Sequence, residues 1–216
     1  MKLELSPTDL LSLLSKQIDN LFVFDRTKET ECLSSAVETA LLQCEYCFIR
    51  TKNKYYKKDG ETYFNPFHSG QYSIFLYFVS HALFNAGSNP TLADRVYFLN
   101  KCLNGLDLFY EVRMPKVFFL DHPVGSVLGR ATYGKGFYFS QNCTVGNNKS
   151  KYPTLGQNVK MMSGSKILGD CQIGDHVIFS ANTYVKDYNV PSFSLVFGSS
   201  PNLIIKQMPE SYFAIA

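Results

Sequence analysis

One period governs residues 155–185 of this chain. Every sixth residue there is apolar: Leu155, Met161, Ile167, Ile173, Phe179 and Val185. The residue four positions after each of the first five is small or β-branched: Val159, Ser165, Cys171, Val177 and Thr183. This period is neither the 3.6 of an α-helix nor the 2 of a simple strand. It is typical of a parallel β-helix built from hexapeptides, in which each hexad makes one short strand and one corner.

The same register begins earlier, because Tyr133, Phe139 and Val145 also fall six residues apart. The segment from Gly146 to Thr154 interrupts it, and we expect this segment to leave the coil as a projecting loop. A chance apolar run in an ordinary sheet would not keep both patterns in one register. With ~18 residues per coil, the hexads predict about three coils between residues 120 and 206, whose open ends need capping.

The first half of the chain has helical periodicity instead. Ser6-Pro7-Thr8-Asp9 resembles a helix start, and further helices are expected at about 29–49, 72–84 and 92–103. Residues 52–66 are polar and Lys-rich, and we expect them to be irregular. The composition changes after Gly105. We therefore predict an α+β protein, with an α-helical domain at 1–105 and a β-helix domain with a short C-terminal tail at 106–216.

Composition and charge argue against nucleic-acid binding, a membrane span and a disulfide framework. The formal charge of +3 is small for 216 residues, and Lys52, Lys54, Lys57 and Lys58 form the main basic cluster, so no nucleic-acid partner is expected. No signal peptide and no uncharged apolar window of about 18–20 residues is visible, so no membrane span is expected. The six cysteines form no disulfide framework. These features favour a cytoplasmic protein.

Several short segments resemble the serine acetyltransferases. The opening motif is Asp107-Leu-Phe followed by Phe119-Leu-Asp121-His122-Pro-Val-Gly125. Later segments follow in the same order: Leu128-Gly129, Cys143-Thr-Val-Gly146, Met162 to Gly169, and Val185-Lys-Asp. Upstream, the segment from Asn65 to Tyr72 resembles an acceptor-binding segment of that family. The resemblance covers roughly residues 65–206. It implies a left-handed parallel β-helix of hexapeptide repeats that transfers acetyl from acetyl-CoA to a hydroxyl.

The resemblance also implies residue roles. His122 would be the general base, because a histidine titrates near neutrality, and Asp107 would orient its ring. Asp121 lies next in the strand and points to the opposite side, so it would bind the acceptor. The backbone N–H of Gly146 would stabilise the oxyanion. Coenzyme A would lie along small corner residues and two lysines: Ser163, Gly164, Ser180, Ala181, Lys186 and Lys206.

Two departures from the family concern the acceptor. Asn65 replaces an aspartate, and Lys151-Tyr152 replaces an Arg-His pair in the projecting loop. These residues would still face the acceptor, but serine would lose charged contacts. The departures fit the serine-acetyltransferase-like enzymes of polysaccharide biosynthesis, whose acceptor is a sugar hydroxyl.

Alternatives of other classes remain. A zinc enzyme of the γ-carbonic-anhydrase kind needs three converging histidines, and no second histidine falls near His122 in register, so no metal is expected. A non-catalytic hexapeptide-repeat assembly subunit would retain the fold alone. The resemblance implies a homotrimer, and the helices could pair two trimers.

Overall fold

The structure is a computed structural model that describes residues 1–87 and 89–214. It contains two compact units, Met1–Glu111 and Val112–Ala216, and each is described by itself. The boundary predicted near Gly105 stays a prediction. Within the described residues, no helix is both long enough and apolar enough to cross a membrane.

Four helices dominate the first unit: α1 (Pro7–Leu21), α2 (Arg26–Phe48), α3 (Ser69–Ala86) and α4 (Pro90–Asn104). Ser6 caps α1 as expected, since its hydroxyl accepts a hydrogen bond of 3.1 Å from the Asp9 N–H. Gly87 and Gly105 end α3 and α4 in the left-handed conformation. Residues Ile74–Val79 of α3 are buried all round, which identifies α3 as the core helix of this unit.

The segment expected to be irregular contains short regular elements. A 3-10 helix (Lys54–Tyr56) leads into β2 (Lys57–Lys58), which pairs antiparallel with β3 (Glu61–Phe64). Asp59 and Gly60 both have positive φ, 54° and 81°. The Asp-Gly pair is a known signal for a two-residue hairpin turn, so the expectation of an irregular segment was wrong here. The strand β1 (Lys2–Leu3) pairs parallel with β3.

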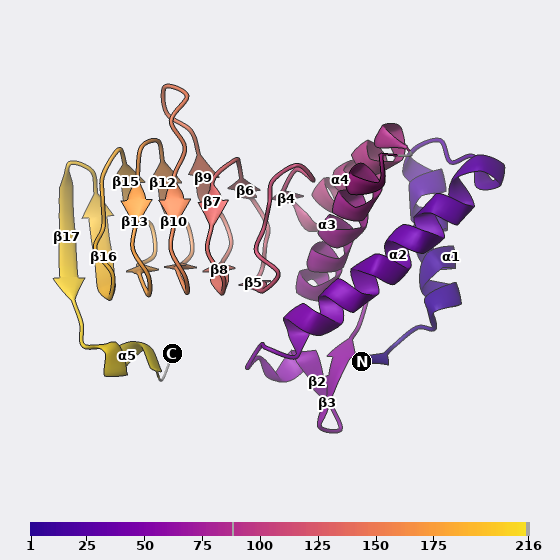
Figure 1. Cartoon of the computed structure of the whole chain (residues 1–216), viewed down its shortest axis with the longest axis horizontal. Helices are drawn as coiled ribbons and strands as arrows, with labels where there is room; N and C mark the ends of the chain where they lie inside the picture. The colour runs from indigo at the N-terminus through magenta and orange to yellow at the C-terminus, as the bar shows by residue number, and fades with distance from the viewer. Residues whose placement is uncertain (88, 215–216) are drawn as a thin grey trace. The chain divides into compact units, whose positions relative to one another are not determined.

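The second unit is a coil of short parallel strands that form three sides (Figure 1). The first side stacks β5 (Phe118–Leu120), β8 (Phe137–Phe139), β11 (Lys160–Met161), β14 (Ile178–Phe179) and β16 (Ser194–Ser199). The second side stacks β6 (Ser126–Leu128), β9 (Thr144–Gly146), β12 (Lys166–Leu168) and β15 (Tyr184–Lys186). The third side stacks β7 (Thr132–Tyr133), β10 (Thr154–Leu155) and β13 (Gln172–Ile173).

This architecture confirms the fold class predicted from the hexads, but the number of coils was underestimated. Five strands are stacked on the first side where about three coils were expected. The expected number was an undercount, because residues 120–206 at ~18 residues per coil make nearly five coils. The coil begins before residue 120, and its last strand, β16, turns back into β17 (Asn202–Gln207), its antiparallel partner. The helix α5 (Glu210–Ala214) follows. The hairpin therefore provides a cap at the C-terminal end of the coil.

The periodic residues fill the centre of the coil. The six apolar hexad positions are at most 4% exposed, and the five small or β-branched positions are at most 1% exposed. Polar members of the second set have partners: the Thr183 hydroxyl donates to the Val196 carbonyl at 3.1 Å. At the same corner, the Ser126 hydroxyl donates to the Ser140 carbonyl at 2.9 Å. Small side chains thus fill this corner without leaving buried polar atoms unpaired.

The segment 147–153 projects from the coil between β9 and β10, as predicted (Figure 1). Asn148 and Lys151 pair across its base, and Lys149 and Ser150 at its tip have positive φ. The Asn148 side chain donates a hydrogen bond of 2.5 Å to the Asp187 carboxylate one coil further on. The loop base is therefore attached to the stack.

Glycine and asparagine alternate along one corner of the coil. Gly125 and Gly164 have φ of 74° and 73°, and a Cβ at either position would collide with the side chain of Asn142 or Asn182, respectively. Both asparagines have positive φ as well, a conformation that asparagine tolerates better than most residues. The corner therefore requires glycine wherever an asparagine from the next coil covers it.

Replacing Ile167 by alanine should destabilise the coil by about 2–5 kcal/mol, because a cavity would remain in a fully buried position. Urea unfolding followed by circular dichroism would measure this loss. Leu168→Ala is the matched control, because the neighbouring side chain points out of the coil and is only half-buried. An equal loss from both variants would contradict the assignment of Ile167 to the interior.

Candidate active site

The Asp121-His122 pair lies in an expanded corner of the coil. Leu120 stacks on Phe139, and Val127 stacks on Thr144. The chain takes seven residue steps from position 120 to position 127, whereas it takes five from 139 to 144 in the next coil. Five steps recur in the next coils, from 161 to 166 and from 179 to 184. The corner after β5 thus contains two extra residues, and they bring the histidine out of the regular stack.

His122 is exposed and has a positive φ of 49°. Within the described part of its own unit, its ring makes no hydrogen bond or ring contact. The other three histidine rings are engaged. His68 caps α3 through a hydrogen bond of 3.3 Å from the Gln71 N–H, His81 bonds to the Tyr110 carbonyl at 2.6 Å, and His176 stacks on Phe193. His122 is therefore the histidine best placed to meet a ligand.

Asp121 is held by a tyrosine from the next coil. Its carboxylate accepts a hydrogen bond of 2.9 Å from the hydroxyl of Tyr138. Burial raises the pKa of Tyr138 well above its ordinary value, and the hydrogen bond to Asp121 and the negative charge of that group raise it further. Tyr138 therefore stays protonated near neutral pH and acts as the donor.

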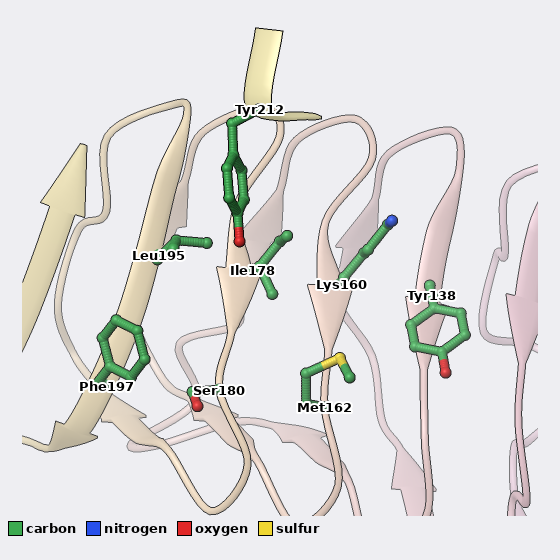
Figure 2. A pocket seen from close by; sticks show the side chains of 8 residues that line it. All are labelled: Tyr138, Lys160, Met162, Ile178, Ser180, Leu195, Phe197 and Tyr212. Carbon is green, nitrogen blue, oxygen red and sulfur yellow. The ribbon is translucent and has the colours of Figure 1, made fainter. Parts of the chain in front are cut away.

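A groove of about 460 Å³ runs along the outer face of the first side. Its lining comes from successive coils and from the C-terminal helix: Tyr138, Lys160, Met162, Ile178, Ser180, Leu195, Phe197 and Tyr212. Figure 2 shows these side chains on one face of the stacked strands, with Tyr212 reaching in from α5. The lining is mainly apolar, and through Tyr138 the groove adjoins Asp121. This shape suits an elongated ligand whose end meets the expanded corner.

Two of the residues predicted to bind a cofactor lie on this face. Ser180 lines the groove. Lys206 is paired with Leu195 across the β16–β17 hairpin, and its ammonium lies 5.8 Å from the ring centre of Phe197. Antiparallel partners share a face, so Lys206 extends the same surface. The groove therefore has a cation near its C-terminal end.

The other predicted cofactor residues lie at corners or on another side. The hydroxyl of Ser163 is 3.5 Å from that of Ser140, and Gly164 and Ala181 occupy the corner between the first and second sides. Lys186 belongs to β15 on the second side, and its N–H donates to the Ser200 hydroxyl at 3.0 Å. Ser180 and Lys206 thus lie on the face that carries the groove, whereas Lys186 lies apart from it.

Asp107 belongs to the helical unit, where two side chains engage it. It ends the short strand β4 (Leu106–Asp107). The Tyr97 hydroxyl donates to one carboxylate oxygen and the Lys101 ammonium to the other, each at 2.6 Å. Burial alone would raise the pKa of Asp107, but both hydrogen bonds and the charge of Lys101 outweigh it, so the pKa lies below its ordinary value. Its proposed pairing with His122 stays a prediction.

The remaining predicted residues have less specific surroundings. The Asn65 side chain accepts a hydrogen bond of 2.8 Å from the Phe67 N–H and so shapes the turn before α3. Lys151 and Tyr152 are exposed on the projecting loop. Gly146 ends β9, where that loop leaves the coil. Their roles toward an acceptor or an oxyanion stay predictions.

Sequence reasoning missed Tyr138 and Tyr212. The alternation Phe137-Tyr138-Phe139 could have placed Tyr138 on the outer face, because Phe137 and Phe139 are buried and strand side chains alternate. No periodicity in the short tail pointed to Tyr212. Over residues 1–87 and 89–214, no three His, Cys, Asp or Glu side chains form a group that could hold a metal ion.

The lowered pKa of Asp107 predicts an acid-sensitive contribution to stability. The ionised group is stabilised in the folded state, so its contribution is present above the unfolded pKa near 3.9 and is lost as pH falls through the folded pKa. Asp107→Asn should therefore lower the melting temperature at pH ~6 and have less effect at pH ~3. The loss should be at most about 1 kcal/mol, since Lys101 is 45% exposed. A deficit that grows on acidification would contradict this, and Lys101→Met should show the same pH trend.

Comparison with known proteins shows what this chain is similar to. Residues 152–187 match the model "Bacterial transferase hexapeptide (six repeats)". A serine acetyltransferase of Staphylococcus aureus (strain Mu50 / ATCC 700699) is 28% identical over 145 residues, which span 65% of this chain and 67% of that protein.

Solved structures agree on the fold. Serine acetyltransferase from Neisseria gonorrhoeae superposes with a TM-score of 0.75 at 20% identity, covering 99% of this chain and 84% of that one. Serine acetyltransferase from Brucella abortus strain S19, solved in complex with coenzyme A, gives a TM-score of 0.65 at 17% identity, covering 94% of this chain and 83% of that one. Residues 152–187 therefore carry hexapeptide repeats, and in sequence and fold this chain is similar to the serine acetyltransferases.

Proposed function

We propose that this protein is an acetyl-CoA-dependent O-acetyltransferase. The observation that supports it most directly is the apolar groove along the first side, which adjoins the expanded Asp121-His122 corner through Tyr138. Coenzyme A is a long ligand with a thiol at one end, and a related structure from Brucella abortus was solved with it. The groove would receive the pantetheine arm and present the acetyl thioester at the corner.

His122 would act as the general base. An alcohol has a pKa far above neutrality, so it attacks a thioester slowly unless a positioned base removes its proton. In this mechanism the acceptor oxygen bonds to the acetyl carbon and the bond from that carbon to sulfur breaks. The proton taken by His122 passes to the departing thiolate of coenzyme A. Asp107 would orient the imidazole, as the family resemblance implies, and the Gly146 N–H would stabilise the oxyanion.

The acceptor would be a saccharide hydroxyl or a serine-like hydroxyl. The saccharide is favoured because Asn65 and Lys151-Tyr152 replace charged groups that serine would use in the related enzymes. The Asn65 side chain is also engaged in its own turn. Asp121 would bind the acceptor beside the base. A saccharide acceptor would place the enzyme in polysaccharide biosynthesis, and the cytoplasmic location expected from the sequence remains part of this proposal.

Removing the imidazole tests the function directly. Release of free thiol from acetyl-CoA would be measured with L-serine, glucose and N-acetylneuraminic acid as acceptors. His122→Ala should lower the best wild-type rate by about 10²–10⁴-fold, because the base is lost. Binding of coenzyme A, measured by calorimetry, should be nearly unchanged.

Asn158→Ala is the control for this experiment, because it shortens the side chain of another exposed residue that has a positive φ. It should retain activity. Activity of His122→Ala equal to that of the wild type would exclude His122 as the base. Two results together would favour the non-catalytic assembly subunit instead: coenzyme A does not bind, and the wild-type protein releases no thiol with any acceptor.

We also propose that the protein is a homotrimer. Related coils share sites between neighbouring subunits, as the resemblance implies, and this coil leaves Val127 and Met162 43% and 39% exposed. Light scattering should give a mass of three times the 24.5 kDa chain, or six times if two trimers pair. A monomer at micromolar concentration would contradict this proposal.

A further inference from the structure

Tyr138 is shared by the two parts of the proposed site. It is the outward residue of β8, stacked between Phe119 of β5 and Lys160 of β11. Its ring lines the groove, and its hydroxyl reaches Asp121 at 2.9 Å. Within the part of the chain that the structure describes, no other side chain donates a hydrogen bond to this carboxylate.

The hydrogen bond has the properties of an orienting contact. Asp121 is half-buried at the end of a strand, and its own N–H is fixed to the Phe139 carbonyl at 3.1 Å. A bond from a neutral hydroxyl to a carboxylate is stronger than one between neutral groups. The phenol ring is held in the stack, so its hydroxyl selects one orientation of the carboxylate. The corners of the next three coils have no carboxylate there: Ser140, Met162 and Ser180 occupy the positions equivalent to Asp121.

We propose that Tyr138 is a positioning residue, whose hydroxyl orients Asp121 toward the acceptor while its ring forms the wall of the acyl-donor groove. This inference rests on the proposed acetyl transfer and on Asp121 as the acceptor-binding carboxylate. It assigns separate tasks to two parts of one side chain. The hydroxyl acts on acceptor binding, and the ring acts on binding of acetyl-CoA.

Tyr138→Phe separates these tasks, because it removes the hydroxyl and keeps the ring. With the best acceptor of the panel, the acceptor KM should rise about tenfold, the expected effect of losing a hydrogen bond to a charged group. The kcat should change by less than about twofold, since the contact serves ground state and transition state alike. Affinity for coenzyme A should be unchanged, whereas Tyr138→Ala should weaken it as well.

Two further variants test whether Tyr138 acts through Asp121. Tyr184→Phe removes a hydroxyl from the second side, outside the groove, and should change neither constant. Tyr138→Phe combined with Asp121→Asn should raise the acceptor KM no further than Asp121→Asn alone, because the two residues act as one unit. Additive effects, or an unchanged KM in Tyr138→Phe, would overturn the positioning role while leaving acetyl transfer intact.

A readout without turnover separates this inference from the proposed function. In protein labelled with ¹³C at aspartate carboxyl groups, the Asp121 resonance should shift between wild type and Tyr138→Phe at pH 7, and should not shift in Tyr184→Phe. A resonance that stays in place would refute the orienting contact. Wild-type protein that transfers acetyl to no acceptor would refute the proposed function, and the positioning role with it, even where the shift establishes the hydrogen bond.

Discussion

The structure of the second unit depends on stacking side chains of like kind in register. Each coil places an apolar residue above another of similar size, and the parallel backbone bonds fix the vertical spacing at about 4.8 Å. Burial of Leu155, Met161, Ile167 and their equivalents supplies the driving force. Every other feature of this unit, including the groove and the expanded corner, is built outward from that column.

The outer face is free to vary because the inner face is so constrained. Strand residues alternate, so Tyr138, Lys160, Ile178 and Leu195 form a row outside while their neighbours fill the interior. Each coil therefore contributes one side chain to this outer face. The C-terminal segment adds Tyr212 to it. An elongated ligand could therefore contact several coils at once.

The sequence predicted the coil from the residues that fill its interior, because their six-residue period can be recognised without knowing which residues they contact. It also predicted the projecting loop and the capped start of α1. It could not predict that Tyr138 donates to Asp121, since that bond joins residues 17 apart whose proximity follows from stacking. His68 shows the converse: it lies in the segment 65–72, which resembles an acceptor-binding segment, yet its imidazole caps α3. The resemblance predicted a role for His122, whereas the expanded corner around it follows from the strand register, which the sequence alone does not give.

The two added residues after β5 change nothing above or below them, because the strands on either side return to the same register. An insertion in a globular core would shift whole elements, whereas here its effect is absorbed within one bend. The bends of such a coil are therefore places where short insertions can add new chemistry. The strands that form the three sides are unchanged by them.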